Sequence, residues 1–192
     1  MIKKTLWLIF AVTLLACQLT SPLAKPDYRQ EGQQSLDRGD HAQAIEKFTQ
    51  ANNANPNDAT LYYLRGTSYY GRYKIAFDIN PSNANVVDFN HALLDFSKAI
   101  ELSPNYAEAY SFRGIAYAGL GSNDLALADY NKAIEINPDL DTTYYGRAYL
   151  YEKMGKRDLA IADYKRFLEL TKDVYWRTEA ERRLNVLQNQ SP

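Results

Sequence analysis

The chain has few of the side chains that covalent crosslinks and catalysis require. Its 192 residues contain one cysteine and two histidines. A single cysteine excludes an intrachain disulfide, so packing alone must hold the fold together. A nucleophilic cysteine also needs a base held beside it by a folded scaffold. Cys17 instead follows an apolar run at the front of the chain, where neither a disulfide nor a catalytic role is expected.

The other candidate groups form no catalytic or ligand-binding motif. His41 and His91 lack an HxxxH spacing, and the chain has no phosphate-binding loop, GxSxG turn or dinucleotide-binding glycine motif. Lysine and arginine number 22 against 23 aspartate and glutamate, a net charge of −1, whereas nucleic-acid-binding domains usually carry a basic excess. We therefore expect no enzyme activity, no metal site, no cofactor and no nucleic-acid partner.

Residues 1–16 have the pattern of a secretion signal. Lys3 and Lys4 give a positive start, and the apolar run LWLIFAVTLL follows. This run has the length of a signal-peptide core and is short for a membrane-spanning helix. The next residues, LLAC, end at Cys17 and resemble the lipobox of bacterial lipoproteins. The alternatives are an ordinary cleaved signal that contains the cysteine, or an uncleaved anchor.

The lipobox resemblance implies a lipid anchor in the bacterial envelope. In that family the chain is cut before the cysteine, which then carries diacylglycerol and an amide-linked acyl chain; two or more chains anchor a protein durably. Gln18 follows the cysteine, and the absence of aspartate there implies the periplasmic face of the outer membrane. Residues 17–26 read as a tether, which would extend at most roughly 30 Å and keep the folded part close to its membrane.

Downstream, the sequence repeats with a period of 34 residues, and residues 106–139 align with 140–173 without a gap. The fourth position of the unit is Tyr28, Tyr62, Tyr110 or Tyr144, the eighth is Gly32, Gly66, Gly114 or Ala148, and the twentieth is Ala44, Ala92, Ala126 or Ala160. This pattern resembles the tetratricopeptide repeat, a helix–turn–helix unit. Arginine and aspartate also recur at fixed positions, which predicts structural pairing.

The resemblance implies an all-α fold, a right-handed solenoid of four helix–turn–helix repeats. We expect the repeats at residues 27–58, 59–106, 107–140 and 141–172. Proline closes each of the first three repeats because it cannot continue a helix. Residues 173–192 should form a capping helix and tail, since Trp176, Ala180, Leu184 and Leu187 share one helical face.

Repeat 2 breaks the period with 14 extra residues near 74–89, at the turn between its two helices. Insertions in repeat arrays lie in loops, often on binding faces. One interpretation is a longer first helix followed by a loop folded onto its own edge. The other is a recognition loop or a dimer contact.

In tetratricopeptide proteins the first helix of each repeat lines a concave groove that binds a partner. The residues that match those positions, with one neighbour, are Thr60, Tyr63, Thr67, Tyr70, Glu108, Ser111, Phe112, Ile115, Tyr145, Tyr149 and Glu152. The groove is thus expected to be rich in tyrosine and nearly uncharged. The lysine and asparagine pair with which chaperone-binding members hold a terminal carboxylate is missing.

These features together predict a membrane-anchored scaffold or adaptor that binds a peptide or protein segment of the envelope in this groove. Tyrosine suits such recognition because its ring gives a rigid contact area and its hydroxyl a hydrogen bond. The alternatives are a self-associating structural lipoprotein, or an assembly factor for an envelope complex that resembles the pilotins.

Overall fold

The computed structural model describes residues 26–79 and 86–189, and every regular element in this part of the chain is an α-helix. The helices are α2 (Tyr28–Asp37), α3 (His41–Ala54), α4 (Ala59–Ile79), α5 (Val86–Leu102), α6 (Ala107–Gly119), α7 (Asn123–Ile136), α8 (Asp141–Lys153), α9 (Arg157–Leu170) and α10 (Val174–Asn189). The predicted signal peptide, Cys17 and nearly all of the predicted tether lie outside the described residues.

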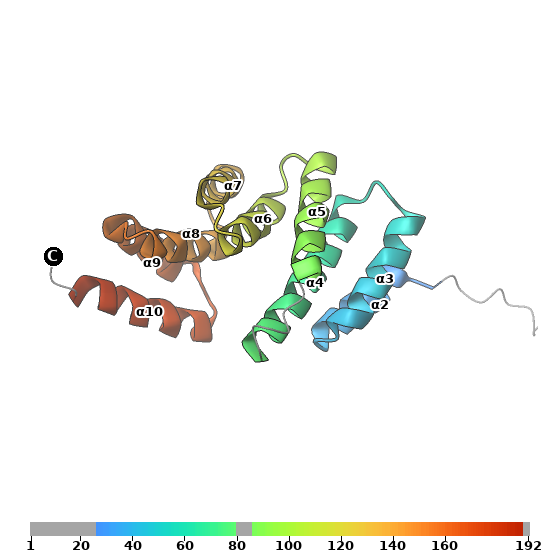
Figure 1. The fold of residues 1–192 in the computed structure, drawn as a ribbon, viewed down its shortest axis with the longest axis horizontal. Helices are drawn as coiled ribbons and strands as arrows, with labels where there is room; N and C mark the ends of the chain where they lie inside the picture. The colour runs from blue at the N-terminus through green and yellow to red at the C-terminus, as the bar shows by residue number, and fades with distance from the viewer. Residues whose placement is uncertain (1–25, 80–85, 190–192) are drawn as a thin grey trace, which may run out of the picture.

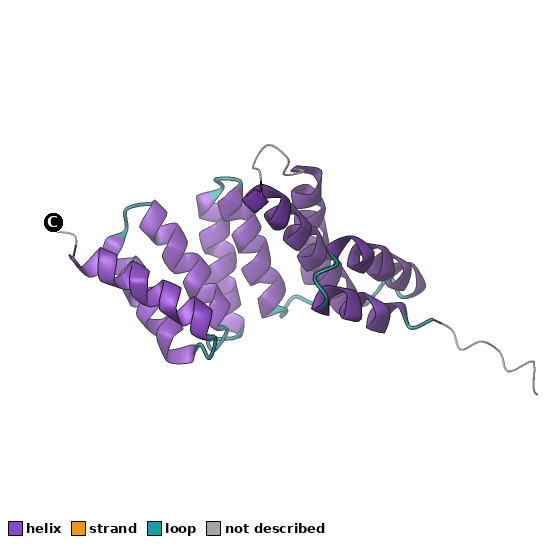
Figure 2. Ribbon diagram, turned by 90° about the horizontal axis from the view of Figure 1, so that it is seen from below, coloured by secondary structure: helices purple, strands orange, loops and turns teal. Residues whose placement is uncertain are grey.

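The helices form a row of antiparallel hairpins (Figures 1 and 2). Each helix packs mainly against its neighbours in sequence, so α2 pairs with α3, α4 with α5, α6 with α7 and α8 with α9, while α10 packs on α9. Each range expected for a repeat therefore contains one hairpin. The helices α2 and α10 lie at opposite ends of the row.

Each hairpin closes around an aromatic ring of its second helix. A Cβ atom at Gly32 would lie 2.7 Å from Cε1 of Phe48, and one at Gly66 would lie 2.7 Å from Cε1 of Phe96. Both rings are fully buried. The small residue at the eighth position of the repeat is therefore a steric requirement, because a side chain there would displace the ring from the core.

A buried arginine–aspartate pair ties the two helices of a hairpin together. Arg65 donates two hydrogen bonds, at 2.8 and 2.7 Å, to the carboxylate of Asp95, and the equivalent pairs are Arg113–Asp129 and Arg147–Asp163. Burial raises the pKa of Asp95, and the guanidinium opposes that rise. The predicted structural pairing is confirmed, and bidentate geometry compensates for the desolvation of the carboxylate.

The insertion in repeat 2 lengthens both helices of its hairpin. The first helix, α4, continues to Ile79, and α5 begins at Val86. Arg72 donates hydrogen bonds to Asp88 at 2.7 and 2.5 Å, seven residues beyond Arg65 and seven before Asp95. Seven residues are nearly two helical turns, so the same faces meet again. The spacing of seven residues, between the two arginines and between the two aspartates, is visible in the sequence and could have predicted this second ion pair.

The longer first helix expected for the insertion is confirmed, since α4 continues to Ile79 and α5 begins at Val86. The loop expected to follow it falls on residues 80–85. Phe89 packs against the Tyr73 ring, with centroids 4.8 Å apart, and lies where a Cβ of Gly119 would be. The recognition and dimer roles stay untested, and residues 80–85 lie outside the described residues.

Asn52 is a polar residue in an apolar position. Its side chain is 4% exposed, and neither Oδ1 nor Nδ2 has a hydrogen-bond partner. The equivalent residues of the next three repeats are Ile100, Ile134 and Leu168. A buried polar group without a partner costs about 1–3 kcal/mol.

We predict that Asn52→Leu, which keeps the side-chain size, raises the free energy of unfolding by about 1–3 kcal/mol. Urea unfolding followed by circular dichroism measures the change. The control is Asn53→Leu at the exposed neighbouring position, which should change stability by less than about 0.5 kcal/mol. An Asn52→Leu protein no more stable than wild type would show that the buried Asn52 amide does not destabilise the fold.

His41 is packed between the first two hairpins. A Cβ at Gly71 would overlap the His41 imidazole ring, and the ring Nδ1 is buried without a partner. Burial lowers the pKa of His41 below its usual 6.5, Asp40 opposes the shift, and Arg72 adds to it. The neutral ring is therefore the form that the fold accommodates.

Stability should consequently fall as the pH drops below about 6.5, because the unfolded chain then takes up a proton that the folded chain resists. We predict that His41→Phe removes this part of the pH dependence, since Phe89 already occupies the equivalent place against Gly119. Urea unfolding of both proteins at pH 5, 6, 7 and 8 measures it. Parallel stability curves for the two proteins would show that His41 does not titrate as described.

Candidate functional site

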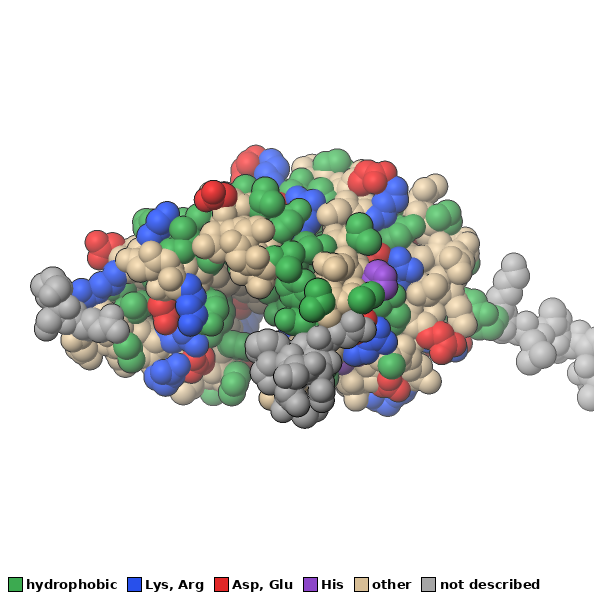
Figure 3. Space-filling view, in the orientation of Figure 1, with side chains coloured by type: hydrophobic (Ala, Val, Ile, Leu, Met, Phe, Trp, Pro, Cys, Tyr) green, Lys and Arg blue, Asp and Glu red, His purple; other side chains and the backbone are tan. Residues whose placement is uncertain are grey.

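The concave side of the row is formed by the first helices of the hairpins. Helices α6 and α8 contact each other directly although α7 separates them in sequence. Figures 1 and 3, in the same orientation, show a hollow at the lower edge of the molecule, between α10 and the end of α4, with hydrophobic side chains beside it. The groove residues expected from the sequence belong to these first helices.

Three of the expected groove residues form an aromatic cluster between repeats 2 and 3. The Phe112 ring lies 5.7 Å from the Tyr63 ring and 6.3 Å from the Tyr70 ring, centroid to centroid. Tyr63 also packs against Tyr106 at 5.1 Å. Burial raises the pKa of both Tyr63 and Tyr70. These half-buried rings join α4 to α6, and only part of their surface is available to a ligand.

Ser111 lies inside the protein, so its assignment to the groove is wrong. Its side chain is fully buried, and its Oγ accepts a hydrogen bond of 2.9 Å from Oγ1 of Thr143. Thr143 is equally buried and belongs to the next repeat. The close approach of α6 and α8 places this position between the helices, where a small hydroxyl fits.

Helix α10 packs against the expected groove residues of repeat 4. The Tyr145 ring lies 5.1 Å from the Trp176 ring, and the Arg183 guanidinium lies 4.8 Å from the centre of the Tyr149 ring. Arg183 also pairs with Glu152 at 3.2 Å. Helix α10 borders this end of the concave face, in the place that the first helix of a fifth repeat would take, while Tyr149 stays 38% exposed and Tyr145 and Glu152 stay partly exposed.

A charge network fixes α10 in that place. Glu152 accepts a hydrogen bond of 2.8 Å from the Tyr164 hydroxyl in addition to its pair with Arg183. Arg183 also donates to Glu179 at 2.8 Å. Hydrogen bonds from Arg182, with further attraction from Arg183, lower the pKa of Glu179 to about 2. The Glu179 carboxylate thus stays charged over the whole physiological range.

The part of the groove that remains accessible lies on α4 and α6. Thr60, Thr67, Glu108 and Ile115 are partly exposed there. Thr67 donates a hydrogen bond to the Leu64 carbonyl, and Thr60 is hydrogen-bonded to Tyr106. This surface combines hydroxyl groups, aromatic edges and one carboxylate. It suits contact with a peptide and offers no constellation for catalysis among the described residues.

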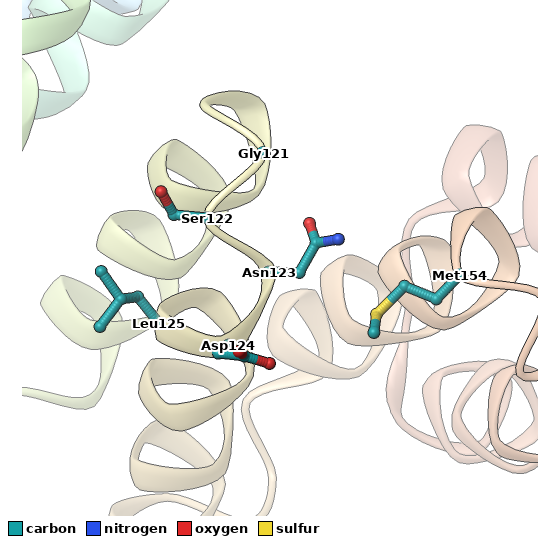
Figure 4. A pocket seen from close by; sticks show the side chains of 6 residues that line it. All are labelled: Gly121, Ser122, Asn123, Asp124, Leu125 and Met154. Carbon is teal, nitrogen blue, oxygen red and sulfur yellow. The ribbon is translucent and has the colours of Figure 1, made fainter.

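A second depression lies outside the concave face, between the turns of the third and fourth hairpins (Figure 4). It is lined by Gly121, Ser122, Asn123, Asp124, Leu125 and Met154. None of the residues predicted for the groove lines it. In residues 26–79 and 86–189, no three histidine, cysteine or carboxylate side chains are grouped to hold a metal ion.

None of the described helices has the length and apolar character needed to cross a bilayer. The predicted signal segment, residues 6–15, lies outside the described residues.

Comparisons of the sequence identify the repeat unit. Residues 119–155 match the profile of the TPR repeat family, and residues 141–174 match that of the tetratricopeptide repeat. A curated relative is the heat shock protein sti1 homolog of Schizosaccharomyces pombe, 30% identical over 100 residues. The match covers 52% of this chain but only 15% of that protein.

Solved structures share the fold over most of the chain. A thermophilic tetratricopeptide protein of Thermus thermophilus matches 94% of this chain and 90% of its own, with a TM-score of 0.70 and 24% identity. The first tetratricopeptide domain of RPAP3, bound to an HSP90 peptide, covers 68% of this chain and 90% of its own, with a TM-score of 0.55 and 22% identity. YrrB, described as having an unusual peptide-binding site, covers 81% and 73%, with a TM-score of 0.60 and 21% identity. The predicted all-α solenoid is confirmed.

We predict that Arg183→Ala loosens α10, because it removes the contacts to Tyr149 and Glu152 together. Amide hydrogen exchange in residues 174–189 should become at least about tenfold faster, while α2–α5 keep their protection. The control is Arg182→Ala, whose side chain is 60% exposed and pairs only with Glu179 of the same helix. Equal exchange in the two variants would show that Arg183 does not hold α10.

Proposed function

Because the chain carries tetratricopeptide repeats and its described part is a solenoid of such hairpins, we propose that it is a membrane-anchored scaffold of the bacterial envelope. Its groove on α4 and α6 binds a segment of another protein. One observation carries this proposal. Thr67 and Ile115 on the concave faces of α4 and α6 are partly exposed, and α10 borders this groove through its contacts with Tyr145 and Glu152 on α8.

The chemistry of this surface selects an apolar segment with hydrogen-bonding groups. The edges of Tyr63, Tyr70 and Phe112 offer rigid apolar contact area, and Thr67 offers a hydroxyl group. An extended or helical peptide laid along such a face would be held by a few anchoring side chains. The peptide bound by RPAP3 and the binding site described for YrrB support peptide recognition as the use of this fold.

The anchor belongs to the same proposal. Cys17 is acylated after cleavage of residues 1–16, and residues 17–26 tether the repeats to the periplasmic face of the outer membrane. The lipobox LLAC and the apolar run before it support this reading. A scaffold held in this way meets its partner within roughly 30 Å of the membrane surface.

We predict that Cys17→Ala removes the anchor. The variant should move from the membrane fraction to the soluble periplasmic fraction, or accumulate with its signal uncleaved. Cell fractionation and intact-protein mass measure this, since the wild-type protein should carry the mass of its acyl chains. A variant with the mass increment and membrane partition of wild type would contradict acylation of this cysteine.

The groove is tested by capture of a partner from detergent-solubilised envelope extract on the immobilised full chain. We predict that Thr67→Arg combined with Glu108→Lys abolishes retention, because both side chains lie on the concave face and neither belongs to the buried core. The matched control is Lys165→Glu, which reverses an exposed charge on α9.

Each outcome of this capture experiment has a distinct meaning. A protein retained by wild type and by the Lys165→Glu variant, but lost from the groove variant, supports the proposal. Equal retention by all three proteins overturns the groove. Retention of an envelope assembly component whose insertion fails without this chain favours the pilotin-like alternative, and retention of only the chain itself favours self-association.

A further inference from the structure

One edge of the row collects the turns within the hairpins. The turns between α6 and α7 and between α8 and α9 lie there, along the upper side of Figure 2. The end of α10 reaches the same edge, since Arg157 at the start of α9 donates a hydrogen bond of 3.2 Å to the Gln188 carbonyl. We call this the turn edge, and it is separate from the concave groove.

The turn edge carries many of the exposed apolar side chains of the described surface. Seven of the twelve exposed large hydrophobic side chains lie on it: Ile75, Val86, Val87, Leu120, Leu125, Leu159 and Val186. All seven come from repeats 2 to 4 and α10. Single exposed hydrophobic residues need no explanation, but a row of them along one edge marks an interaction surface.

Three cations stand among these apolar side chains at the turn between α8 and α9. Lys153, Lys156 and Arg157 have no ion-pair partner among the described residues, whereas Lys98 and Lys132 on the second helices are paired with Glu101 and Glu135. Lys156 is the N-cap of α9 and makes no side-chain capping bond. Two positive charges therefore lie beside the positive end of the helix dipole.

Two carboxylates share this edge and do not cancel that charge. Asp124 and Asp158 lie in the first turns of α7 and α9, where the helix dipoles already favour them. Lys156 lies over the Tyr151 ring and Arg157 donates a hydrogen bond to the Gln188 carbonyl, but neither pairs with a carboxylate among the described residues. The remaining positive charge would be complemented by an anionic group of a binding partner.

We propose that the turn edge of repeats 3 and 4 is a second docking surface, for an acidic amphipathic segment of another protein. Its apolar side chain enters the depression between Leu125 and Met154 (Figure 4). Its carboxylates pair with Lys153, Lys156 and Arg157. Exposed ion pairs contribute little on their own, so apolar burial supplies most of the affinity and the charges select the partner.

The position of the N-terminus favours a protein over a lipid surface as the occupant. The chain enters α2 at the edge opposite the turn edge, since a first helix ends at the turn. A helix of 13 residues, such as α8, separates the two edges by about 20 Å. On the proposed function, in which Cys17 carries the lipid, the membrane would lie nearest the opposite edge.

The probes are two 14-residue amphipathic helical peptides, each with leucine on one face and either glutamate or lysine on the other. Each is titrated into the full ¹⁵N-labelled chain in mild detergent. The glutamate peptide should shift the amide signals of residues 120–125 and 153–159, and bind at least about tenfold more tightly than the lysine peptide. Raising the salt concentration should weaken that preference.

Matched variants separate this surface from the rest of the molecule. Lys153→Glu combined with Lys156→Glu should weaken the glutamate peptide about tenfold or more, whereas the same reversal at Lys165 and Lys172 should not. Leu125→Ser should weaken it, whereas Leu94→Ser, at a residue 67% exposed on α5, should not.

The groove variant, Thr67→Arg with Glu108→Lys, should bind the glutamate peptide like wild type, so failure here is distinguishable from failure of the groove. The proposal is overturned if neither peptide binds, if both bind equally, or if the shifts fall on the concave faces of α4 and α6. Dimerisation of the chain that Leu125→Ser abolishes would also overturn it, because a second copy would then be the occupant.

Discussion

The structure depends on one steric constraint, the seating of a large ring against a residue with almost no side chain. Phe48 on Gly32 and Phe96 on Gly66 set the distance between the helices of their hairpins. That distance brings an arginine within reach of an aspartate across the hairpin, as in the pair of Arg65 and Asp95. A single hairpin still exposes an apolar face, so hairpins must stack. The concave face follows from this stacking.

The features that recur in every hairpin could be predicted from the sequence. The ring, the small residue opposite it and the ion pair are local requirements, so each leaves a mark at a fixed position. Contacts between repeats leave fewer such marks, although His41 on Gly71 and Phe89 on Gly119 occupy equivalent positions. The burial of Ser111 depends on how closely α6 approaches α8, and the contacts of Tyr145 and Glu152 with α10 depend on where α10 docks. Both were missed because they depend on the distances between helices of different repeats. Those distances cannot be predicted from the pattern of a single repeat.

The two candidate surfaces differ in the kind of ligand that each would bind. The groove of α4 and α6 is nearly uncharged and joins two repeats through aromatic rings, so a ligand there must match a shape. The turn edge carries unpaired cations beside exposed leucines and valines, so a ligand there must match a charge pattern. A scaffold with two surfaces of unlike chemistry can hold two proteins at once without competition between them.

Unsatisfied polar groups are distributed very unevenly along the row. Four of the five buried side-chain atoms without a partner among the described residues belong to α3, in His41, Gln50 and Asn52. The chain enters the row through the hairpin that contains α3. A pulling force between the N-terminus and anything bound to repeats 3 and 4 would therefore reach the weakest hairpin first. That hairpin would unfold first under load. Its extension would limit the force that reaches the binding surfaces of repeats 3 and 4.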